Sequence, residues 1–297
     1  LLLFYYLCFK LRNGTYKSAT FHIPDRYVVL KNRNMKITTL TSCCVDFFPE
    51  QNKIYVGGNS LNFATQCKLS NIENVSIVGA VGNDKCGKLI KTHLDKNKIN
   101  HSHLYEIGEV TASNKIFIDN EGDRYFKPDS WNGGAFDIFR LSENDWNYIT
   151  DSTIIAMPAG DPNLNELLKR RNNNQTIVID FLDYFKVSHI EKLIDKIDIT
   201  FLSGKEEILD DLRKLSLKFK KMIVVTLGAK GSVAFYNEKT YFQEAIKVRE
   251  ITDTTGCGDS FQAAFSIEWI QTKDIEKSLK AGSIAASKVL AFIGAVE

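Results

Sequence analysis

The residues best suited to chemistry lie in the segment TDTTGCGDSFQAAF, which runs from Thr252 to Phe265. Apolar residues recur at helical spacing from Phe261 onward, so a helix is predicted to begin near Gly258. The first N–H groups of a helix have no intrahelical acceptor, and glycines let an anion approach them closely. Such amides can hold a phosphoryl group during its transfer, and Asp259 beside them can accept the proton of an attacking hydroxyl.

A plainer interpretation of the same segment stays open. The glycines also fit an ordinary turn before a helix, and Asp259 in the first turn would complement the positive end of the helix dipole. Because glycine-rich loops before helices are common, phosphoryl transfer needs support from other parts of the chain.

A second polar cluster, VGGNSLNFA, begins at Val56. Gly57 and Gly58 end a β-rich run, and Asn59 and Asn62 lie three residues apart on one face of the helix that follows. Asparagine offers both a donor and an acceptor, which suits the hydroxyls of a sugar. The alternative is a plain turn in which Asn59 caps the helix.

Two further groups of polar residues follow predicted strands. In VVTLGAKGS, Thr226 ends a buried run and Gly228 and Gly231 follow, at the sheet edge where α/β folds bind ligands. The alternative there is a tight turn to the next strand. Asp46, in CCVDFFP, lies at the end of the first strand, where a carboxylate can bind two hydroxyls of a polyol. It is equally a candidate turn residue ahead of Pro49.

The elements that must position these residues alternate between strands and helices from Met35 onward. Runs of β-branched residues that are apolar on both faces predict strands at 36–40, 75–80, 153–157, 176–180, 199–202 and 222–226. Segments with helical periodicity predict helices at 60–70, 86–96, 162–173, 189–196 and 205–220. This alternation predicts an α/β fold with a doubly wound, mostly parallel sheet and helices on both faces.

Two regions, about 50–58 and 108–128, break the alternation and are predicted to be strands with hairpin turns. We expect them to form a small β-sheet lid that projects from the main domain. A lid beside the carboxyl ends of the parallel strands would be placed to cover a ligand.

Composition narrows the function further. The 297 residues, 44% hydrophobic and 25% charged, are typical of a soluble globular protein with a full core. A net charge of +2 gives no electrostatic basis for binding nucleic acid or an anionic membrane. None of the six cysteines forms a C-x-x-C pair, which argues against a zinc site, and a reduced, cytoplasmic setting is expected.

The first 34 residues do not follow this pattern. The apolar run before Lys10 is too short to span a bilayer, and it lacks the basic start and the cleavage site of a signal peptide. We expect residues 1–34 to be a foreign, upstream-translated or private N-terminal extension, and residues 35–297 to be the functional domain.

The motifs gain specificity from their order along the chain. Asp46 is followed by G-G-N-x-x-N, VGAVGNDKCG, T-L-G-x-x-G and finally D-T-x-G-x-G-D. This series resembles the ribokinase-like, PfkB-type carbohydrate kinase family over residues 35–297, and its last motif is the most specific. Within the family, CVDFFPEQNKIYVGGNSLNFA and GEVTASNKIFIDNEGDRYF are most similar to the fructosamine kinases. The resemblance implies a ribokinase-like fold with a small β-sheet lid.

The resemblance also implies a role for each matching residue. Asp259 would be the catalytic base, beside an anion hole formed by the amides of Gly256, Cys257, Gly258 and Asp259. The sugar would contact Asp46, Gly57, Gly58, Asn59, Asn62 and, on the lid, Arg124. ATP would lie along Thr226, Gly228, Lys230 and Gly231, with Gly282 nearby. Glu206 would position Mg²⁺ through water, and Asp253 and Thr255 match positions that hold a monovalent cation, such as K⁺, in some members.

The chain departs from the family pattern at a few positions. Cys257 replaces the usual small inert residue of the anion loop, and a thiol at a helix N-terminus is expected to ionise more readily and to be prone to oxidation. Ser203 stands where the magnesium motif has asparagine, Thr41 and Ser42 replace a frequent Gly-Asp pair, and Gly282 stands where asparagine is common.

The function that this resemblance implies is Mg-ATP-dependent phosphorylation of a hydroxyl on a sugar or on a sugar-amine of the fructoselysine type. Two alternatives stay open: a kinase for another sugar, sugar phosphate or nucleoside, and a non-catalytic sensor on the same fold. A sugar phosphate would need cations such as Arg124 and Lys127 near the lid. Unpaired strand edges on the lid would suit a homodimer.

Overall fold

The computed structural model of this chain describes residues 35–119, 124–183, 186–291 and 293–295, and the backbone of two short strands that precede them. These strands, β1 (Leu7–Lys10) and β2 (Tyr16–Ala19), pair antiparallel in a sheet of their own. The predicted extension, residues 1–34, otherwise lies outside the described residues.

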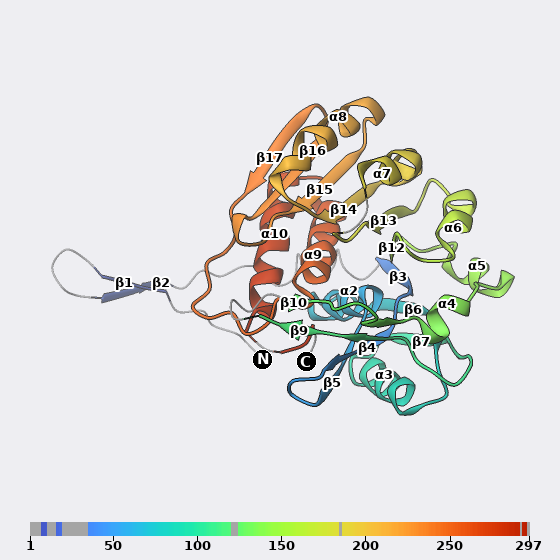
Figure 1. Cartoon of the computed structure of the whole chain (residues 1–297). Coiled ribbons are helices and arrows are strands. Elements are labelled where there is room, and N and C mark those ends of the chain that lie inside the picture. Colours follow the sequence, from blue (N-terminus) through green and yellow to red (C-terminus); the bar gives the residue numbers. More distant parts are fainter. Residues whose placement is uncertain are drawn as a thin grey trace.

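A nine-stranded sheet forms the centre of the domain, in the order β17-β16-β15-β14-β13-β12-β3-β6-β7 (Figure 1). Its strands are β3 (Lys36–Thr41), β6 (Asn74–Val81), β7 (Asn100–Glu106), β12 (Ile154–Pro158), β13 (Thr176–Asp180), β14 (Ile199–Ser203), β15 (Met222–Thr226), β16 (Ser232–Tyr236) and β17 (Lys239–Gln243). The strands from β15 to β7 are parallel, whereas β16 and β17 add an antiparallel hairpin at one edge. The carboxyl ends of the parallel strands therefore meet along one side of the sheet.

Helices cover both faces of this sheet. One layer contains α2 (Asn59–Leu69), α3 (Lys85–Lys96), α9 (Cys257–Thr272) and α10 (Ile275–Val289). The other contains α4 (Gly134–Ile138), α5 (Glu143–Ile149), α6 (Leu164–Arg170), α7 (Val187–Leu193) and α8 (Leu209–Phe219). Among the described residues, 3-10 helices lie in the connections: η1 (Ile194–Lys196), η2 (Glu206–Ile208) and η3 (Gly228–Lys230). Within the described part of the chain, no helix combines the length and apolarity needed to cross a bilayer.

Two hydrophobic cores lie on opposite faces of the sheet. Val224 of β15 packs into the core under α2, α9 and α10, whereas its neighbours Ile223 and Val225 pack into the core under α4 to α8. Successive side chains of a strand point to opposite faces, so a strand buried on both faces must be apolar throughout. This pattern made six of the seven parallel strands recognisable; β7, whose sequence NHSHLYE is largely polar, was not predicted. The predicted doubly wound α/β fold is confirmed.

A smaller sheet accompanies the main one, in the order β11-β8-β4-β5. Its strands are β4 (Cys44–Phe48), β5 (Lys53–Gly57), β8 (Ser113–Lys115) and β11 (Trp131–Asn132), while β9 (Phe117–Ile118) and β10 (Arg124–Tyr125) form a separate antiparallel pair. The sequence predicted strands in the regions 50–58 and 108–128, which contain β5 and β8 to β10, whereas β4 and β11 lie outside those regions. The hairpin turn predicted in the second region lies between β9 and β10. Residues 120–123 of this turn lie outside the described residues.

The position of Asp46 corrects one expectation. It does not end the first strand: β3 ends at Thr41, and Asp46 lies in the middle of β4, in the small sheet. The chain leaves the main sheet at Thr41, whose φ of 67° is left-handed, and Ser42 and Cys43 donate to the carbonyls of Leu40 and Thr41. This tight turn redirects the backbone, so Asp46 is a strand residue rather than a turn residue ahead of Pro49.

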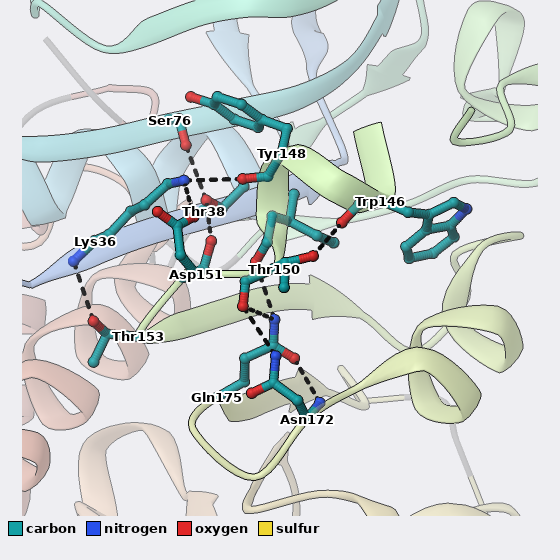
Figure 2. A network of polar contacts seen from close by, with 12 residues as sticks. Lys36, Thr38, Ser76, Trp146, Tyr148, Thr150, Asp151, Thr153, Asn172 and Gln175 are labelled. Atoms are coloured by element: carbon teal, nitrogen blue, oxygen red, sulfur yellow. Dashed lines mark hydrogen bonds and ion pairs between the residues drawn. The ribbon is translucent and has the colours of Figure 1, made fainter. Parts of the chain in front are cut away.

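A polar network holds the amino-terminal side of the sheet, opposite the carboxyl ends (Figure 2). Lys36, the first residue of β3, donates to the carbonyl of Tyr148 at 2.9 Å and pairs with Asp151. Thr38 shares hydroxyl hydrogen bonds with Ser76 and Ser152 at 2.9 and 2.8 Å. These contacts connect the amino-terminal ends of β3 and β6 to the end of α5 and the residues that follow it, so their role is to stabilise the fold.

Candidate active site

The N-terminus of α9 lies at the carboxyl side of the sheet. Gly256 precedes the helix with a left-handed φ of 80°, and a Cβ atom there would lie 2.4 Å from the Cβ of Ala295. The backbone turn therefore requires glycine. Cys257 N donates to Thr254 O at 3.3 Å, and the amides of Gly258 and Asp259 follow in the first turn, whose N–H groups have no intrahelical acceptor. An added Cβ on Gly258 would meet only Gln262 Nε2, at 4.0 Å, so the space beside this amide is open.

The carboxylate of Asp259 is held by two asparagines from α2. Asn59 Nδ2 donates to Asp259 Oδ1 and Asn62 Nδ2 donates to Asp259 Oδ2, both at 2.7 Å. Burial raises the pKa of Asp259 above its ordinary value, against the opposing effects of Asn62, Arg124 and Asn59. The predicted base and both predicted asparagines thus meet, although almost 200 residues separate them in the sequence.

Asp180 belongs to the same cluster and was not predicted. It is the last residue of β13, and its Oδ2 accepts from Asn59 Nδ2 at 2.7 Å while its Oδ1 accepts from Leu182 N at 2.9 Å. Burial, and then the charge of Asp259, raise the pKa of Asp180 to about 7. A signal was present in the sequence, because an acid ends the apolar run TIVID at the edge of the sheet where ligands bind.

Asp46 approaches this cluster from β4. The pKa of Asp46 is raised to about 7. Burial is the largest cause, the charge of Arg124 opposes it, and the charge of Asp259 adds to it. Gly57 lies on the neighbouring strand β5, and a Cβ there would come within 2.1 Å of Asp46 Oδ2. Gly57 therefore leaves the space that the Asp46 carboxylate occupies.

The next glycine, Gly58, shapes the entry to α2. Its φ is 104°, and a Cβ there would lie 2.5 Å from the carbonyl oxygen of Ser42. This conformation starts the helix at Asn59, so that Asn59 and Asn62 both face Asp259.

Two residues that were not predicted lie next to Asp46. The Cys44 thiol lies 3.9 Å from Asp46 Oδ1, and Asn114 of β8 hydrogen-bonds Asp46 and lies with Nδ2 4.0 Å from Cys44 Sγ. Asn114 faces Asp46 because β4 and β8 pair in parallel with these two residues in register. Only the pairing of distant strands reveals this contact.

Arg124 brings the β9–β10 pair to the site. Its backbone N–H donates to Thr254 Oγ1 at 3.4 Å, in the loop before α9. The charge of its guanidinium lowers the pKa of Asp46, of Asp180 and of Asp259. In Figure 1 the β9–β10 pair lies beside the ends of α2 and α9.

The predicted nucleotide loop follows β15. The Thr226 hydroxyl lies 3.0 Å from that of Ser203, and Leu227 N donates to Gly231 O at 2.8 Å, which closes the turn through η3. Lys230 pairs with Glu206 at 3.1 Å. A pocket between the ends of β14 and β15 is lined by Gly204, Lys205, Glu206, Glu207, Leu227 and Lys230.

The predicted cation positions differ in how they are held. Glu206 is exposed, and its carboxylate has the oxygen chemistry that Mg²⁺ prefers. Asp253 is fully buried: its Oδ1 accepts from the amide and hydroxyl of Thr255 at 2.9 and 2.7 Å, and its Oδ2 accepts from Gly294 N at 2.8 Å. These bonds organise the loop before α9. No cluster of three or more His, Cys, Asp or Glu able to hold a metal ion occurs among the described residues.

Two predicted residues lie on the α10 side of the loop. Gly282 lies within α10, where a Cβ would come within 2.7 Å of the Phe261 ring, so this position has a packing reason for glycine. The thiol of Cys257 is directed to the carbonyl oxygen of Ala286, 3.6 Å away.

Comparison with known proteins gives a consistent result. The sequence pattern of the pfkB family carbohydrate kinases matches residues 45–297. Fructoselysine 6-kinase of Escherichia coli (strain K12) is 26% identical over 264 residues, which cover 87% of this chain and 98% of that protein. Fructosamine kinase FrlD of Bacillus subtilis (strain 168) is 26% identical over 267 residues, which cover 88% of this chain and 93% of that protein. The structure of Arabidopsis thaliana ribokinase complexed with ribose and ATP has the same fold, with a TM-score of 0.73 at 22% identity over 88% of this chain and 94% of that one.

Proposed function

Because the chain belongs to the pfkB family of carbohydrate kinases, we propose that it transfers the γ-phosphoryl group of ATP to a hydroxyl of a sugar-amine of the fructoselysine type, with Asp259 as the base. The observation that carries the proposal is the placement of a partly buried, doubly hydrogen-bonded carboxylate at the N-terminus of α9.

The reaction follows from this placement. Asp259 takes the proton of the acceptor hydroxyl as that oxygen attacks the γ-phosphorus, and the bond from phosphorus to the leaving oxygen of ADP breaks. The amides of Gly258 and Asp259 and the dipole of α9 face the charge that develops on the phosphoryl oxygens. The open space beside Gly258 leaves room for those oxygens.

The nucleotide is proposed to lie along Thr226, Gly228, Lys230 and Gly231, beside the pocket between β14 and β15. Glu206 would hold Mg²⁺ through water, and the side-chain oxygens of Asp253 and Thr255 would be available to K⁺. When bound, Mg²⁺ neutralises charge on the phosphates. The packing of Gly282 against Phe261 supports a helix-packing role for that residue over a contact to adenine.

The acceptor is inferred from the hydrogen-bonding character of the site. The side-chain amides of Asn59 and Asn62 donate their hydrogens to carboxylates, and Asn62 Oδ1 is buried without a hydrogen-bond partner. Together with Asp46, these groups offer mainly acceptors, which suits a ligand rich in O–H and N–H donors.

A phosphorylated sugar fits less well. The charge of Arg124 acts on the carboxyl groups of Asp46 and Asp180, and Lys127 lies 3.7 Å from the centre of the Phe117 ring, so neither lid cation is placed solely to bind a phosphate. The two bacterial relatives named for fructoselysine and fructosamine also support an amine-linked fructose as the acceptor.

We also propose that two copies of the chain associate as a homodimer through the small sheet. β5 is an edge strand of that sheet, and Ile54 on it is 48% exposed. An unpaired edge strand offers N–H and C=O groups to a second copy. Light scattering of the purified protein measures the oligomeric state directly.

The proposed function is tested by measuring ADP release with a panel of acceptors: fructoselysine, fructose, fructose 6-phosphate, ribose and adenosine, each with and without K⁺. We expect the highest kcat/KM with fructoselysine. A higher value with a sugar phosphate or a nucleoside would contradict the acceptor class. Sugar or nucleotide binding without ADP release from any of them would favour the sensor alternative.

A further inference from the structure

We infer that Asp180 is a positioning residue of the phosphoryl-transfer site, which acts through Asn59 to fix the carboxylate of Asp259 and to strengthen it as a base. The inference rests on the proposed role of Asp259. It assigns a function to a residue that lies outside the sequence motifs of the site, at the end of β13.

The geometry that carries the inference is a bridge of one amide nitrogen. Asn59 Nδ2 has two hydrogens, and it donates one to Asp180 Oδ2 and one to Asp259 Oδ1, each at 2.7 Å. The orientation of the Asn59 amide is therefore fixed by Asp180, and Asp259 is held through it. Charge-assisted hydrogen bonds of this kind are among the stronger ones in proteins.

Asp180 is itself firmly held. Its Oδ1 accepts from Leu182 N at 2.9 Å, the side chain of Gln262 from α9 also hydrogen-bonds it, and its side chain is only 4% exposed. The carboxylate thus joins β13, α2 and α9 at the point where the reaction takes place. Because Asp180 is buried and fully hydrogen-bonded, it can fix the orientation of the Asn59 amide and, through it, that of the Asp259 carboxylate.

The charges around the bridge give Asp180 a second effect. The titratable and charged groups that act on Asp180 and Asp259 include Asp46 and Cys44 from β4 and Arg124 from β10. Asp253, in the loop before α9, acts on Asp46. The charge of one guanidinium therefore acts on three carboxyl groups. The charge of Asp259 raises the pKa of Asp180. Because repulsion between two like charges is mutual, we expect an ionised Asp180 to make Asp259 hold its proton more tightly. Two acids that interact in this way lose their protons in coupled steps.

A purely structural role predicts something different. If Asp180 only joined β13 to the helices, its replacement would lower thermal stability and leave the titration of Asp259 unchanged. The experiment must therefore read the titration of Asp259 itself.

The test follows the Asp259 carboxyl carbon by NMR in protein labelled with ¹³C at aspartate, with Asp259→Asn used to assign the resonance. In the wild type we expect titration in two coupled steps. In Asp180→Asn we expect the step that arises from Asp180 to disappear, leaving only the coupling to Asp46. The midpoint should fall by about one pH unit, and the pH profile of kcat/KM should shift in the same direction. We expect kcat to fall about tenfold, with the KM for ATP unchanged.

Asp161→Asn is the matched control. Asp161 is also buried and its pKa is also raised to about 7, but its carboxylate bonds Asn163 in the segment before α6. We expect this variant to leave the titration of Asp259 and kcat unchanged.

Asn59→Ala removes the bridge from the other side and covers the case in which Asp180→Asn does not fold. Both substitutions interrupt the same Asp180–Asn59–Asp259 bridge. The kcat of the double variant should therefore be close to that of the less active single variant. An unchanged Asp259 titration in both single variants, or losses in kcat that multiply, would overturn the inference. The NMR titration needs no turnover. An inactive wild type with the expected shift would therefore contradict the proposed function, while still showing that Asp180 controls the proton affinity of Asp259.

Discussion

Asn62 is the residue that makes the role of Asp259 most directly testable. Its Nδ2 donates to Asp259 Oδ2, and its own Oδ1 is buried without a hydrogen-bond partner. In Asp259→Asn the new side chain can accept from Asn59 with its oxygen. Its amide can donate to Asn62 Oδ1 once the Asn62 amide rotates. The substitution therefore keeps the hydrogen bonds and removes only the base and one buried charge.

We predict that Asp259→Asn lowers kcat by roughly 10²–10⁴-fold, the usual contribution of a general base. The melting temperature at pH 8 should not fall, because the substitution removes an anion from a site where burial disfavours charge. Steady-state ADP release and thermal unfolding measure the two effects. Turnover near the wild-type value in a well-folded variant would show that Asp259 is not the base.

At this scale the sequence predicted residues that belong to ordered motifs and missed residues that do not. Asp259, Asn59 and Asn62 are part of spaced glycine-rich segments, and the structure brings them together. Asp180 and Asn114 carry no local pattern, since each reaches the site only because a distant strand ends or pairs there. Such positions depend on strand order, which the alternation of strands and helices does not specify.

At the scale of elements, the α9–α10 pair separates two uses of glycine. Gly258, in the first turn of α9, has open space where a side chain would lie. Gly282, in α10, faces the ring of Phe261, which packs against the rings of Phe201 and Phe265. The first position keeps space for a ligand, whereas the second lets two helices approach.

We predict opposite outcomes for alanine at these two positions. Gly282→Ala should lower the free energy of unfolding by about 1–3 kcal/mol, the usual cost of an added methyl group in a packed core, with kcat nearly unchanged. Gly258→Ala should leave stability unchanged or slightly raised, since alanine favours helix, and lower kcat roughly 10²-fold by displacing the phosphoryl group. Urea unfolding and ADP release measure both variants. A loss of ATP affinity in Gly282→Ala without a loss of stability would restore the contact to adenine expected from the sequence.

The elements themselves were largely predictable, for a physical reason. Strands buried on both faces need continuous apolar residues, so β3, β6 and β12 to β15 were evident in the sequence. β4 was not recognised, because only Ser42 and Cys43 separate it from β3 and the apolar pattern runs on through both. A change of sheet within one apolar run leaves no mark in the pattern.

At the scale of the whole molecule, several buried carboxylates oppose folding as pH rises. Burial raises the pKa of Asp46, Asp161 and Asp180 to about 7, well above the ordinary value of 3.8. Between these two values the folded protein keeps protons that the unfolded chain has lost. The free energy of unfolding from these groups therefore decreases as pH rises from about 4 to about 7. His93 acts in the opposite direction, since burial lowers its pKa to about 4.

Asp161 isolates this effect from catalysis. Both hydrogen bonds that it accepts, from the amide N–H and the Nδ2 of Asn163, go to Oδ1 at 2.7 and 3.0 Å, while Oδ2 is buried without a hydrogen-bond partner. Asp161→Asn with its nitrogen at the Oδ2 position keeps both bonds and removes the charge. The nearby charge of Arg140 lowers the pKa of Asp161 only in part.

We predict that Asp161→Asn stabilises the protein at high pH. The gain should be near zero at pH 4, grow as pH rises through the window between 3.8 and about 7, and level off at roughly 1–4 kcal/mol at pH 8. Chemical unfolding of both proteins at pH 4, 6 and 8 measures the gain, and Asn163→Ala, which removes the hydrogen-bond donor but keeps the acid, should instead destabilise at every pH. A gain for Asp161→Asn that is the same at all three pH values would show that Asp161 is ionised in the folded protein throughout. The charge of Arg140 would then balance the ionised Asp161 in the folded protein.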